Sequence, residues 1–557
     1  MAVFDLMRPA DARVSLRAPI CIIGAGMAGL TIARRLAKAG RRVVVLESGG
    51  GAFDQSVHDL NELEDISGRY TRAMTGHYRG LGGSSTRWGG RMLPISIDET
   101  RERPTPGLPE WPFAVDDLQR YHREIEAMFG IDDGPFDEAA LAGLDEDHIV
   151  PVSDPDFVAR MAKWPKLRRC NLAHILGGEL RAASNVEIWL NATVCDFELD
   201  RESGRLTSVT AHNSAGRELT VRADRFVVTA GTIETTRLLL WLKAQSDGRA
   251  LSTPALGRYL QDHINVRIAR VSRRDSAFSN RFCAYRFRNG TRRSLHLELT
   301  PAAQNREQVA SAFAYFTMDF AGTALDVVKK AARSLQTGDF SIGHMGGIVR
   351  QLPFMARMTW WRYARQQLYL PADVPVHIEI CAEQFPDQRN AITLSVQRDA
   401  LGLPRAAVQW SPLAADERTL RAAAQCLARY WSRNELNHRL PLDWIAPCRD
   451  PAGCISDAAV DYAHPSGSAR MGTDPAVSVV DPDLVCHDVR NLSVMSAAVF
   501  PSAGSANPTF TLLALALRHA DYLSQAEGRV AASARPARPD LVDTMRASWA
   551  IAEGGTR

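Results

Sequence analysis

The stretch Gly24-Ala25-Gly26-Met27-Ala28-Gly29 decides the fold of this 557-residue chain because of what surrounds it. An apolar run at residues 19–23 comes directly before it and is typical of a buried parallel strand. Residues 30–39 then have helical spacing, and a second apolar run at residues 42–46 ends at Glu47. This order of strand, glycine turn, helix, strand and acid predicts a Rossmann-like dinucleotide-binding unit in an α/β protein.

Each conserved part of such a unit would have a physical role here. Gly24 permits the tight turn, Gly26 lets backbone N–H groups approach a pyrophosphate, and Gly29 lets the helix pack closely on the strand. The positive end of the helix stabilises phosphate charge. Glu47 is expected to accept hydrogen bonds from the ribose hydroxyls. The unit alone does not distinguish FAD from NAD, and its plain structural alternative is a glycine-rich turn without a ligand.

Residues 80–91 form a second glycine-rich stretch, Gly80-Leu81-Gly82-Gly83-Ser84-Ser85-Thr86-Arg87-Trp88-Gly89-Gly90-Arg91. A backbone with so little side-chain bulk can lie against a flat ligand. The alternative is a flexible surface loop, but Trp88 argues against it, because flexible linkers rarely contain tryptophan.

This second stretch resembles the flavin-lining loop of the glucose–methanol–choline (GMC) oxidoreductases. Further motifs continue the resemblance in order, namely Trp111-Pro112-Phe113, Ala230-Gly231 before a helix, residues 256–263, and residues 462–472 with His464. The resemblance covers about residues 18–527. It implies a Rossmann-like FAD-binding domain with an inserted substrate domain, built on an antiparallel sheet plus helices.

The resemblance also implies where the domains lie. Residues 14–95, 186–262 and 455–527 would form a discontinuous FAD-binding domain. Residues 96–185 and 263–454 would form the substrate-binding or cap domain, and residues 528–557 a mobile C-terminal tail. Turn signals at residues 202–204 and 214–216 predict a β-meander that leads back to the central sheet.

FAD rather than NAD is the cofactor that the resemblance implies. The expected cofactor contacts beyond the first glycine turn are Gly83, Ser84, Arg87, Trp88, Val194, Ala230, Gly231, Thr235, Ala498, Asn507, Pro508 and Thr509. Some family members carry a histidine with a covalent flavin bond at the position of Arg87, so Arg87 predicts non-covalent FAD. Ser496 stands where many relatives carry Asp.

His464 and Asn507 are the expected catalytic residues. Oxidation of an alcohol requires a base for the hydroxyl proton, and the pKa of histidine suits that task. An Asn amide can hydrogen-bond the developing alkoxide. The family uses a His–His or a His–Asn pair, and His464 with Asn507 matches the second type. His77 and His263 are expected to be structural, and Glu383 a paired core residue.

The sequence of residues 504–509 resembles sugar-oxidising relatives, so a carbohydrate or glycoside hydroxyl is preferred over a non-sugar alcohol. The family also contains lyases that keep FAD without redox turnover, which leaves a non-redox alternative open. The aromatic and basic segment of residues 354–365 predicts a helix that covers the substrate lobe, with docking to a membrane surface or a partner as the alternative. The electron acceptor stays open between oxygen, a quinone and a protein.

The composition of the chain also limits which partners, metal sites and cellular locations are expected. A net charge of +3 argues against a nucleic-acid partner. The nine cysteines match no metal-binding spacing, and no metal site is expected. The sequence shows neither a signal peptide nor an apolar stretch long enough to span a membrane, so we expect a cytoplasmic enzyme without an integral membrane segment.

Overall fold

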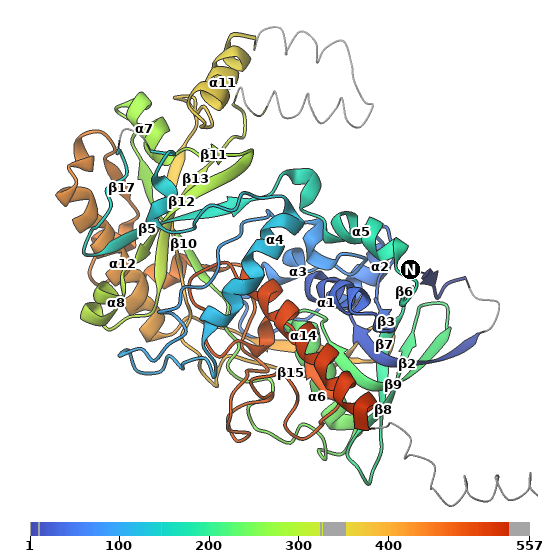
Figure 1. The fold of residues 1–557 in the computed structure, drawn as a ribbon. Helices are drawn as coiled ribbons and strands as arrows, with labels where there is room; N and C mark the ends of the chain where they lie inside the picture. The colour runs from blue at the N-terminus through green and yellow to red at the C-terminus, as the bar shows by residue number, and fades with distance from the viewer. Residues whose placement is uncertain (1, 9–11, 146–147, 324–325, 327–351, 534–557) are drawn as a thin grey trace, which may run out of the picture.

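Two large sheets, each eight-stranded, define two lobes in the computed structural model (Figure 1). The described residues are 2–8, 12–145, 148–323, 326 and 352–533. The lobe with the N-terminal unit contains a mostly parallel sheet, and the other lobe contains an antiparallel sheet. The predicted architecture, a Rossmann-like domain with an inserted antiparallel domain, is therefore confirmed.

The first sheet has the order β1-β6-β3-β2-β9-β8-β7, and β19 pairs with β9. The neighbouring strands β1, β6, β3, β2 and β9 are parallel to one another, whereas β9, β8 and β7 form an antiparallel meander. The strands are β1 (Ala2–Asp5), β2 (Arg13–Ile23), β3 (Val43–Leu46), β6 (Val186–Leu190), β7 (Thr193–Leu199), β8 (Leu206–His212), β9 (Glu218–Val228) and β19 (Leu492–Val494). All of β3 and the end of β2 are buried, as continuous apolar runs in parallel strands require.

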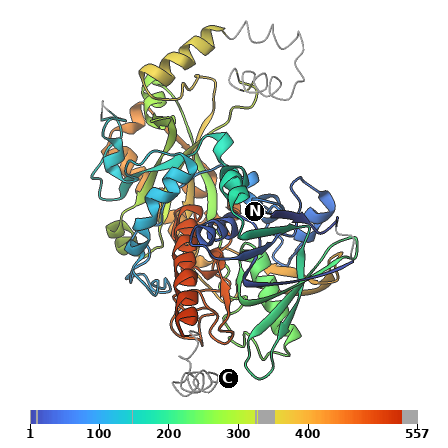
Figure 2. The same ribbon diagram turned by 45° about the vertical axis from the view of Figure 1, so that its right-hand side comes forward.

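Helices from both ends of the chain cover this sheet. Helix α1 (Met27–Lys38) packs against α14 (Thr509–Ser533), and Figures 1 and 2 show the two side by side. Helix α6 (Thr232–Gln245) follows β9, where the sequence predicts a helix. The other helices here are α2 (Gln55–His58), α3 (Ala73–Gly76), α4 (His122–Phe129) and α5 (Leu172–Ala182). Helix α14 runs past residue 528, the expected start of the tail, and residues 534–557 lie outside the described residues.

The second sheet has the order β11-β12-β13-β14-β10-β17, with β5 paired to β12 and β18 paired to β10. Its strands are β5 (Phe157–Trp164), β10 (Ile264–Val271), β11 (Arg286–Arg288), β12 (Thr291–Leu299), β13 (Ala312–Met318), β14 (Val376–Ala382), β17 (Leu442–Trp444) and β18 (Val460–Asp461). Helix α12 (Ala414–Arg433) packs on β13 and β14. The smaller helices are α7 (Ser276–Cys283), α8 (Pro301–Glu307) and α13 (Ala446–Arg449). Strand β18 brings the chain back to this sheet just before His464.

A small third sheet of β15 (Ala391–Arg398), β16 (Pro404–Gln409) and β4 (Glu64–Asp65) packs against α6. Arg237 of α6 forms an ion pair with Asp399 and donates a hydrogen bond to the carbonyl of Pro404 at 2.7 Å. This sheet therefore connects a helix of the first lobe to residues predicted for the cap domain.

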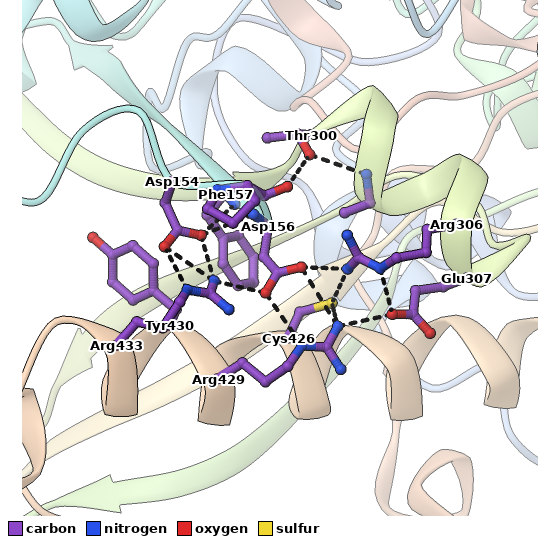
Figure 3. Close-up of polar contacts among 12 residues, drawn as sticks. Asp154, Asp156, Phe157, Thr300, Arg306, Glu307, Cys426, Arg429, Tyr430 and Arg433 are labelled. Carbon is purple, nitrogen blue, oxygen red and sulfur yellow. Dashed lines mark hydrogen bonds and ion pairs between the residues drawn. The ribbon is translucent and has the colours of Figure 1, made fainter.

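A charged cluster ties α8 and α12 to the start of β5 (Figure 3). Asp156, only 1% exposed, forms ion pairs with Arg306, Arg429 and Arg433. Arg433 also contacts Asp154 at 2.7 Å. Because the arginines come from two helices and the aspartates from the segment before one strand, the cluster cross-links three separate elements.

The predicted helix near Trp360 is α11 (Leu352–Ala364), which projects from the top of the cap lobe in Figure 1. It contacts the lobe through Arg362, 3.7 Å from the ring of Phe287, while Trp360 and Tyr363 are 52% and 74% exposed. The helix therefore covers an edge of the lobe rather than a sheet face.

Candidate active site

A cavity in the first lobe is lined by segments that lie far apart in the sequence, including residues that follow β2, β3, β9 and β19. Of the predicted cofactor contacts, the ones that line it are Gly24, Gly26, Glu47, Gly83, Ser84, Val194, Ala230, Gly231, Pro508 and Thr509. His464 lines it as well. Six predicted residues stand outside its wall, namely Gly29, Arg87, Trp88, Thr235, Ala498 and Asn507.

The first glycine turn has the shape that a pyrophosphate requires. Gly24 has a φ of +108°, and a Cβ there would lie 2.9 Å from the carbonyl oxygen of Thr229. A Cβ on Gly29 would collide with the carbonyl oxygen of Gly24, whereas one on Gly26 would meet nothing within 4 Å. Gly29 thus serves close packing, and Gly26 leaves space for a ligand. Helix α1 begins there without a side-chain cap or an acid in its first turn, so its N–H groups are available to an anion.

Glu47 organises the loops around the cavity. Its carboxylate accepts hydrogen bonds from the backbone N–H groups of Ala25 at 2.7 Å, and of Gly49 and Gly80 at 3.0 Å each. Burial raises the pKa of Glu47, and these hydrogen bonds together with the charge of Arg79 oppose that rise. A carboxylate offers about four acceptor positions, so about one remains for a ribose hydroxyl.

The second glycine stretch lies directly against the first. The N–H of Gly82 donates to the carbonyl of Ala25 at 2.9 Å, and a Cβ on Gly83 would lie 2.9 Å from the Cα of Gly26. Arg87 lies over the rings of Phe53 and Tyr78, at 4.5 and 4.8 Å.

Trp88 and two other predicted contacts point into packed protein. The Trp88 indole donates to the carbonyl of Cys170 at 2.9 Å. Thr235 is buried in α6, and the Ala498 carbonyl accepts from Ala469 at 2.8 Å. Ser496 lines the cavity, and its hydroxyl accepts from the N–H of Ala498 at 3.3 Å. The structure thus gives Trp88, Thr235 and Ala498 supporting positions.

His464 is joined to His263, whose expected role was structural. The Nδ1 atoms of the two rings are 2.9 Å apart, and His263 Nε2 lies 2.8 Å from the carbonyl oxygen of Gly504. A carbonyl only accepts, so His263 Nε2 carries a proton and donates it. In a neutral His263, Nδ1 must then accept, which makes His464 Nδ1–H the donor. His464 Nε2 is left unprotonated, as a base requires.

The surroundings of His464 favour its neutral form. Burial lowers its pKa well below the usual value, and the nearby His263 and the charge of Arg91 lower it further. Burial also lowers the pKa of His263 to about 4. The backbone N–H of His464 donates to Asp262 Oδ1 at 2.9 Å, which fixes the position of the residue. The sequence could not reveal this pair, because 201 residues separate the two histidines.

Asn507 is buried, and its Oδ1 has no partner among the described residues. The loop before it is held by two buried carboxylates. Glu99 accepts from the N–H of Ser505 at 2.6 Å, and Glu383 accepts from the N–H of Gly504 at 3.0 Å. Glu383 also pairs with Arg103 at 2.6 Å, as expected of a paired core residue. Helix α14 begins at Thr509, so Asn507 lies just before the start of this helix.

Aromatic residues extend the site from His464 toward the antiparallel sheet. The ring of Tyr462 lies 5.0 Å from the ring of His464, and its hydroxyl is 2.7 Å from the hydroxyl of Tyr315 on β13. Tyr315 also donates to Glu379 at 2.8 Å. Sequence reasoning did not single out Tyr315 and Glu379, because their only signal is a polar side chain within a strand of the substrate domain.

None of the helices in the described part of the chain has the length and hydropathy of a membrane-spanning segment. Within the same residues, no group of three or more His, Cys, Asp or Glu side chains is arranged to hold a metal ion.

Comparison with known proteins gives consistent matches along the chain. Residues 386–516 match the model of the GMC oxidoreductases, and residues 19–275 match that of FAD-dependent oxidoreductases. The chain is 24% identical to 2-methyl-1,2-propanediol dehydrogenase of Mycolicibacterium austroafricanum, over 91% of this chain and 95% of that protein. It is 22% identical to the fructose dehydrogenase large subunit of Gluconobacter japonicus, over 91% and 98%. The structure of formate oxidase shares the fold, with a TM-score of 0.56 and 18% identity over 93% of this chain and 99% of that one.

Proposed function

Because this chain belongs to the GMC oxidoreductases, FAD-dependent enzymes that act on CH–OH donors, we propose that it oxidises a carbohydrate or glycoside hydroxyl to a carbonyl. His464 is the base in this proposal, and Asn507 is the partner of the alkoxide. The observation that carries it is the hydrogen-bonded path from Gly504 through His263 to His464, which leaves His464 Nε2 free to accept a proton.

The residues around the cavity fit FAD. The open space at Gly26 and the uncapped start of α1 suit its pyrophosphate, and the remaining acceptor position of Glu47 suits a ribose hydroxyl. When bound, FAD supplies the hydride acceptor. Arg87 offers no ring nitrogen for a covalent bond and is engaged with Phe53 and Tyr78, so the cofactor is held without a covalent link.

The chain's own groups then manage the proton and the charge of the substrate oxygen. His464 Nε2 takes the hydroxyl proton, and the Nδ1–H bond to His263 keeps the ring oriented while His464 becomes charged. The Asn507 side chain, which makes no hydrogen bond to described residues, donates its amide N–H to the substrate oxygen. The carboxylates of Glu99 and Glu383 hold the loop that positions this amide.

The test is an anaerobic absorbance measurement of the yellow protein with a panel of sugars, glycosides and simple alcohols. We expect a sugar or glycoside to bleach the flavin, and subsequent air will show whether oxygen accepts the electrons. His464→Ala should slow bleaching about 10³-fold with FAD still bound, and Asn507→Ala should slow it less. His377→Ala removes a half-buried imidazole of β14 and should leave the rate unchanged. Unchanged bleaching in His464→Ala would refute the assignment of the base.

The same measurement separates the alternatives. If only non-sugar alcohols bleach the flavin, the substrate is a non-sugar alcohol and the proposed carbohydrate substrate is wrong. A lyase would convert a substrate while the flavin stays oxidised, although dithionite reduces it. A docking role for α11 as the main function would require that deletion of residues 354–365 abolish activity in free solution, and we expect that activity to remain.

A further inference from the structure

The guanidinium of Arg91 is a positive charge without a hydrogen-bond or ion-pair partner among the described residues. Its Nη1 atom is fully buried and contacts no acceptor. The Cζ atom lies 4.4 Å from the ring centroid of Tyr315 and 5.1 Å from that of Trp164. Aromatic rings attract a cation but do not satisfy its N–H donors. An unfilled donor on a buried nitrogen is costly, so Nη1 of this partly buried side chain is in place for an acceptor that binds from outside the chain.

Arg91 lies next to the proposed base. It is the last residue of the second glycine stretch, and it touches Tyr315, whose hydroxyl is 2.7 Å from that of Tyr462. The ring of Tyr462 in turn contacts His464 at 5.0 Å. Arg91 is therefore linked to the proposed base through Tyr315 and Tyr462, on the side of His464 where the antiparallel sheet lies.

That sheet presents a second unfilled polar group on the same face. Arg160, His296, Tyr315 and Glu379 are paired neighbours across β5, β12, β13 and β14, so their side chains share one face. His296 is buried, stacks on Phe313 at 4.3 Å, and has no partner for either ring nitrogen among the described residues. A neutral imidazole can donate one hydrogen bond and accept another.

The acids of this face are already occupied. Glu379 accepts from Tyr315 and Asn265 at 2.8 Å each, and Glu298 pairs with Arg160 at 2.7 Å. A second guanidinium, of Arg292, lies 4.0 Å from the same Trp164 ring and also has no described ion-pair partner. Within the described part of the chain, the face keeps a positive charge that no carboxylate neutralises.

We propose that Arg91 binds an oxyanionic group of the substrate, a carboxylate or a phosphate, and so selects alcohols that carry such a group. This inference rests on the proposed function and names its class of substrate. A guanidinium matches a carboxylate or phosphate with two parallel hydrogen bonds, and the N–H of His296 can add a third. A neutral sugar offers hydroxyl oxygens to these donors but no negative charge to pair with the guanidinium.

The first test uses matched triplets of alcohols, namely glucose with glucuronate and glucose 6-phosphate, and glycerol with glycerate and glycerol 3-phosphate. The rate of anaerobic flavin reduction is measured for each. We expect a charged member to reduce the flavin at least tenfold faster than its neutral counterpart, and the faster of the two charged members identifies the oxyanion. Equal or faster reduction by the neutral members would overturn the inference and leave the alcohol-oxidising function intact.

Variants then assign the preference to Arg91. Arg91→Gln should remove the preference, so that the ratio of the charged to the neutral rate falls toward one, whereas Arg91→Lys should keep part of it. Arg267→Gln is the matched control, because Arg267 is near the same face, is 54% exposed, and already pairs with Glu379 at 3.5 Å. If Arg267→Gln lowered the preference as much as Arg91→Gln, general charge rather than Arg91 would be responsible.

A binding measurement keeps the inference testable without turnover. Acetate and inorganic phosphate are titrated into the FAD-loaded protein, with acetamide as the neutral probe, and the flavin spectrum reports binding. We expect one anion to bind the parent protein and to bind Arg91→Gln at least tenfold more weakly, even if no alcohol on the panel is oxidised. Equal binding of the anion by both proteins would refute the proposal. Weaker FAD binding as the sole effect of Arg91→Gln would also refute it and would assign Arg91 to the cofactor.

Discussion

At the scale of single residues, one hydrogen bond determines which nitrogen of His464 can act as a base. His263 Nε2 must donate to Gly504, so His263 Nδ1 must accept from His464. His263 is therefore a positioning residue that acts through His464. Because burial, His263 and Arg91 lower the pKa of His464, the base is unprotonated at neutral pH and below it.

A pair of substitutions tests this role. His263→Leu removes the acceptor and should lower the limiting rate of flavin reduction about 10- to 100-fold, which is less than the roughly 10²–10⁴-fold that loss of the base itself would cost. His263→Asn keeps an acceptor oxygen near the Nδ1 position and should recover most of the rate. The parent rate should stay constant from pH 8 down to pH 6, since protonation of His464 begins only well below its usual pKa. Equal losses in the two variants would mean that the ring only fills space.

The residues that the sequence could predict are those whose neighbours along the chain define their role. Gly24, Gly26 and Glu47 belong to a local strand–turn–helix–strand pattern, and the structure places them on the cavity. Trp88 and Thr235 are expected at the cofactor and do not line the cavity; the Trp88 indole donates to Cys170, and Thr235 is buried in α6, so their role stays a prediction. Contacts such as that between Arg91 and Tyr315 depend on the tertiary arrangement and have no local pattern.

At the scale of elements, Asp156 connects β5 with α8 and α12 (Figure 3). Burial alone would raise the pKa of Asp156, but hydrogen bonds from Arg429, Arg433 and Arg306 outweigh it and lower the pKa to about 2. The carboxyl of an unfolded chain has a pKa of about 3.9. The cluster therefore contributes its full stability above about pH 4, and loses it as the pH falls through about 2.

We expect Asp156→Asn to lower the free energy of opening of α12 by about 2 kcal/mol at pH 7. The uncharged Asn side chain cannot form the ion pairs that lower the pKa of Asp156, so their contribution to stability is lost. Native-state hydrogen exchange of the α12 amides measures that free energy, and the difference from the parent should shrink toward pH 2. Asp443→Asn is the matched control, since Asp443 and its partner Arg449 are mostly exposed, and it should change the free energy by less than about 1 kcal/mol. A difference that persists unchanged at low pH would exclude the ion pairs as its cause.

Elements with strong periodicity were predictable, and those defined by long-range pairing were not. Helices α1, α6 and α11 and strand β3 occur where the sequence indicates them. Strands β1, β4 and β18 are short, and each exists because a distant strand offers a free edge. Helix α11 was predicted as a helix, but its exposed aromatic side chains could be recognised only once its neighbours were known.

At the scale of the whole molecule, the cavity joins the two ends of the chain. Its wall includes residues next to α1 and the first residue of α14, and these helices pack together. FAD should therefore protect both helices at once. At a free FAD concentration of 100 times its Kd, amide exchange through unfolding of this lobe should slow about 100-fold in α1 and α14 alike. Exchange in α12, in the other lobe, should change less than threefold.

Hydrogen exchange followed by mass spectrometry, with and without FAD, measures this protection for each helix. The experiment uses the apoprotein and the same protein reloaded with FAD. Protection of α1 without protection of α14 would show that the two ends respond to the cofactor separately, contrary to the expectation from their packing.

The pairing of α1 with α14 also has a consequence for biosynthesis. Helix α1 is translated well before α14, which begins at Thr509. At about 5–20 residues per second, roughly 25–100 seconds pass between the two events. During that time the apolar face of α1 lacks the cover that α14 provides and is open to chaperones, and the cavity is completed only once α14 has been synthesised. Slower growth and co-expressed chaperones should therefore raise the yield of holoenzyme more than added flavin alone.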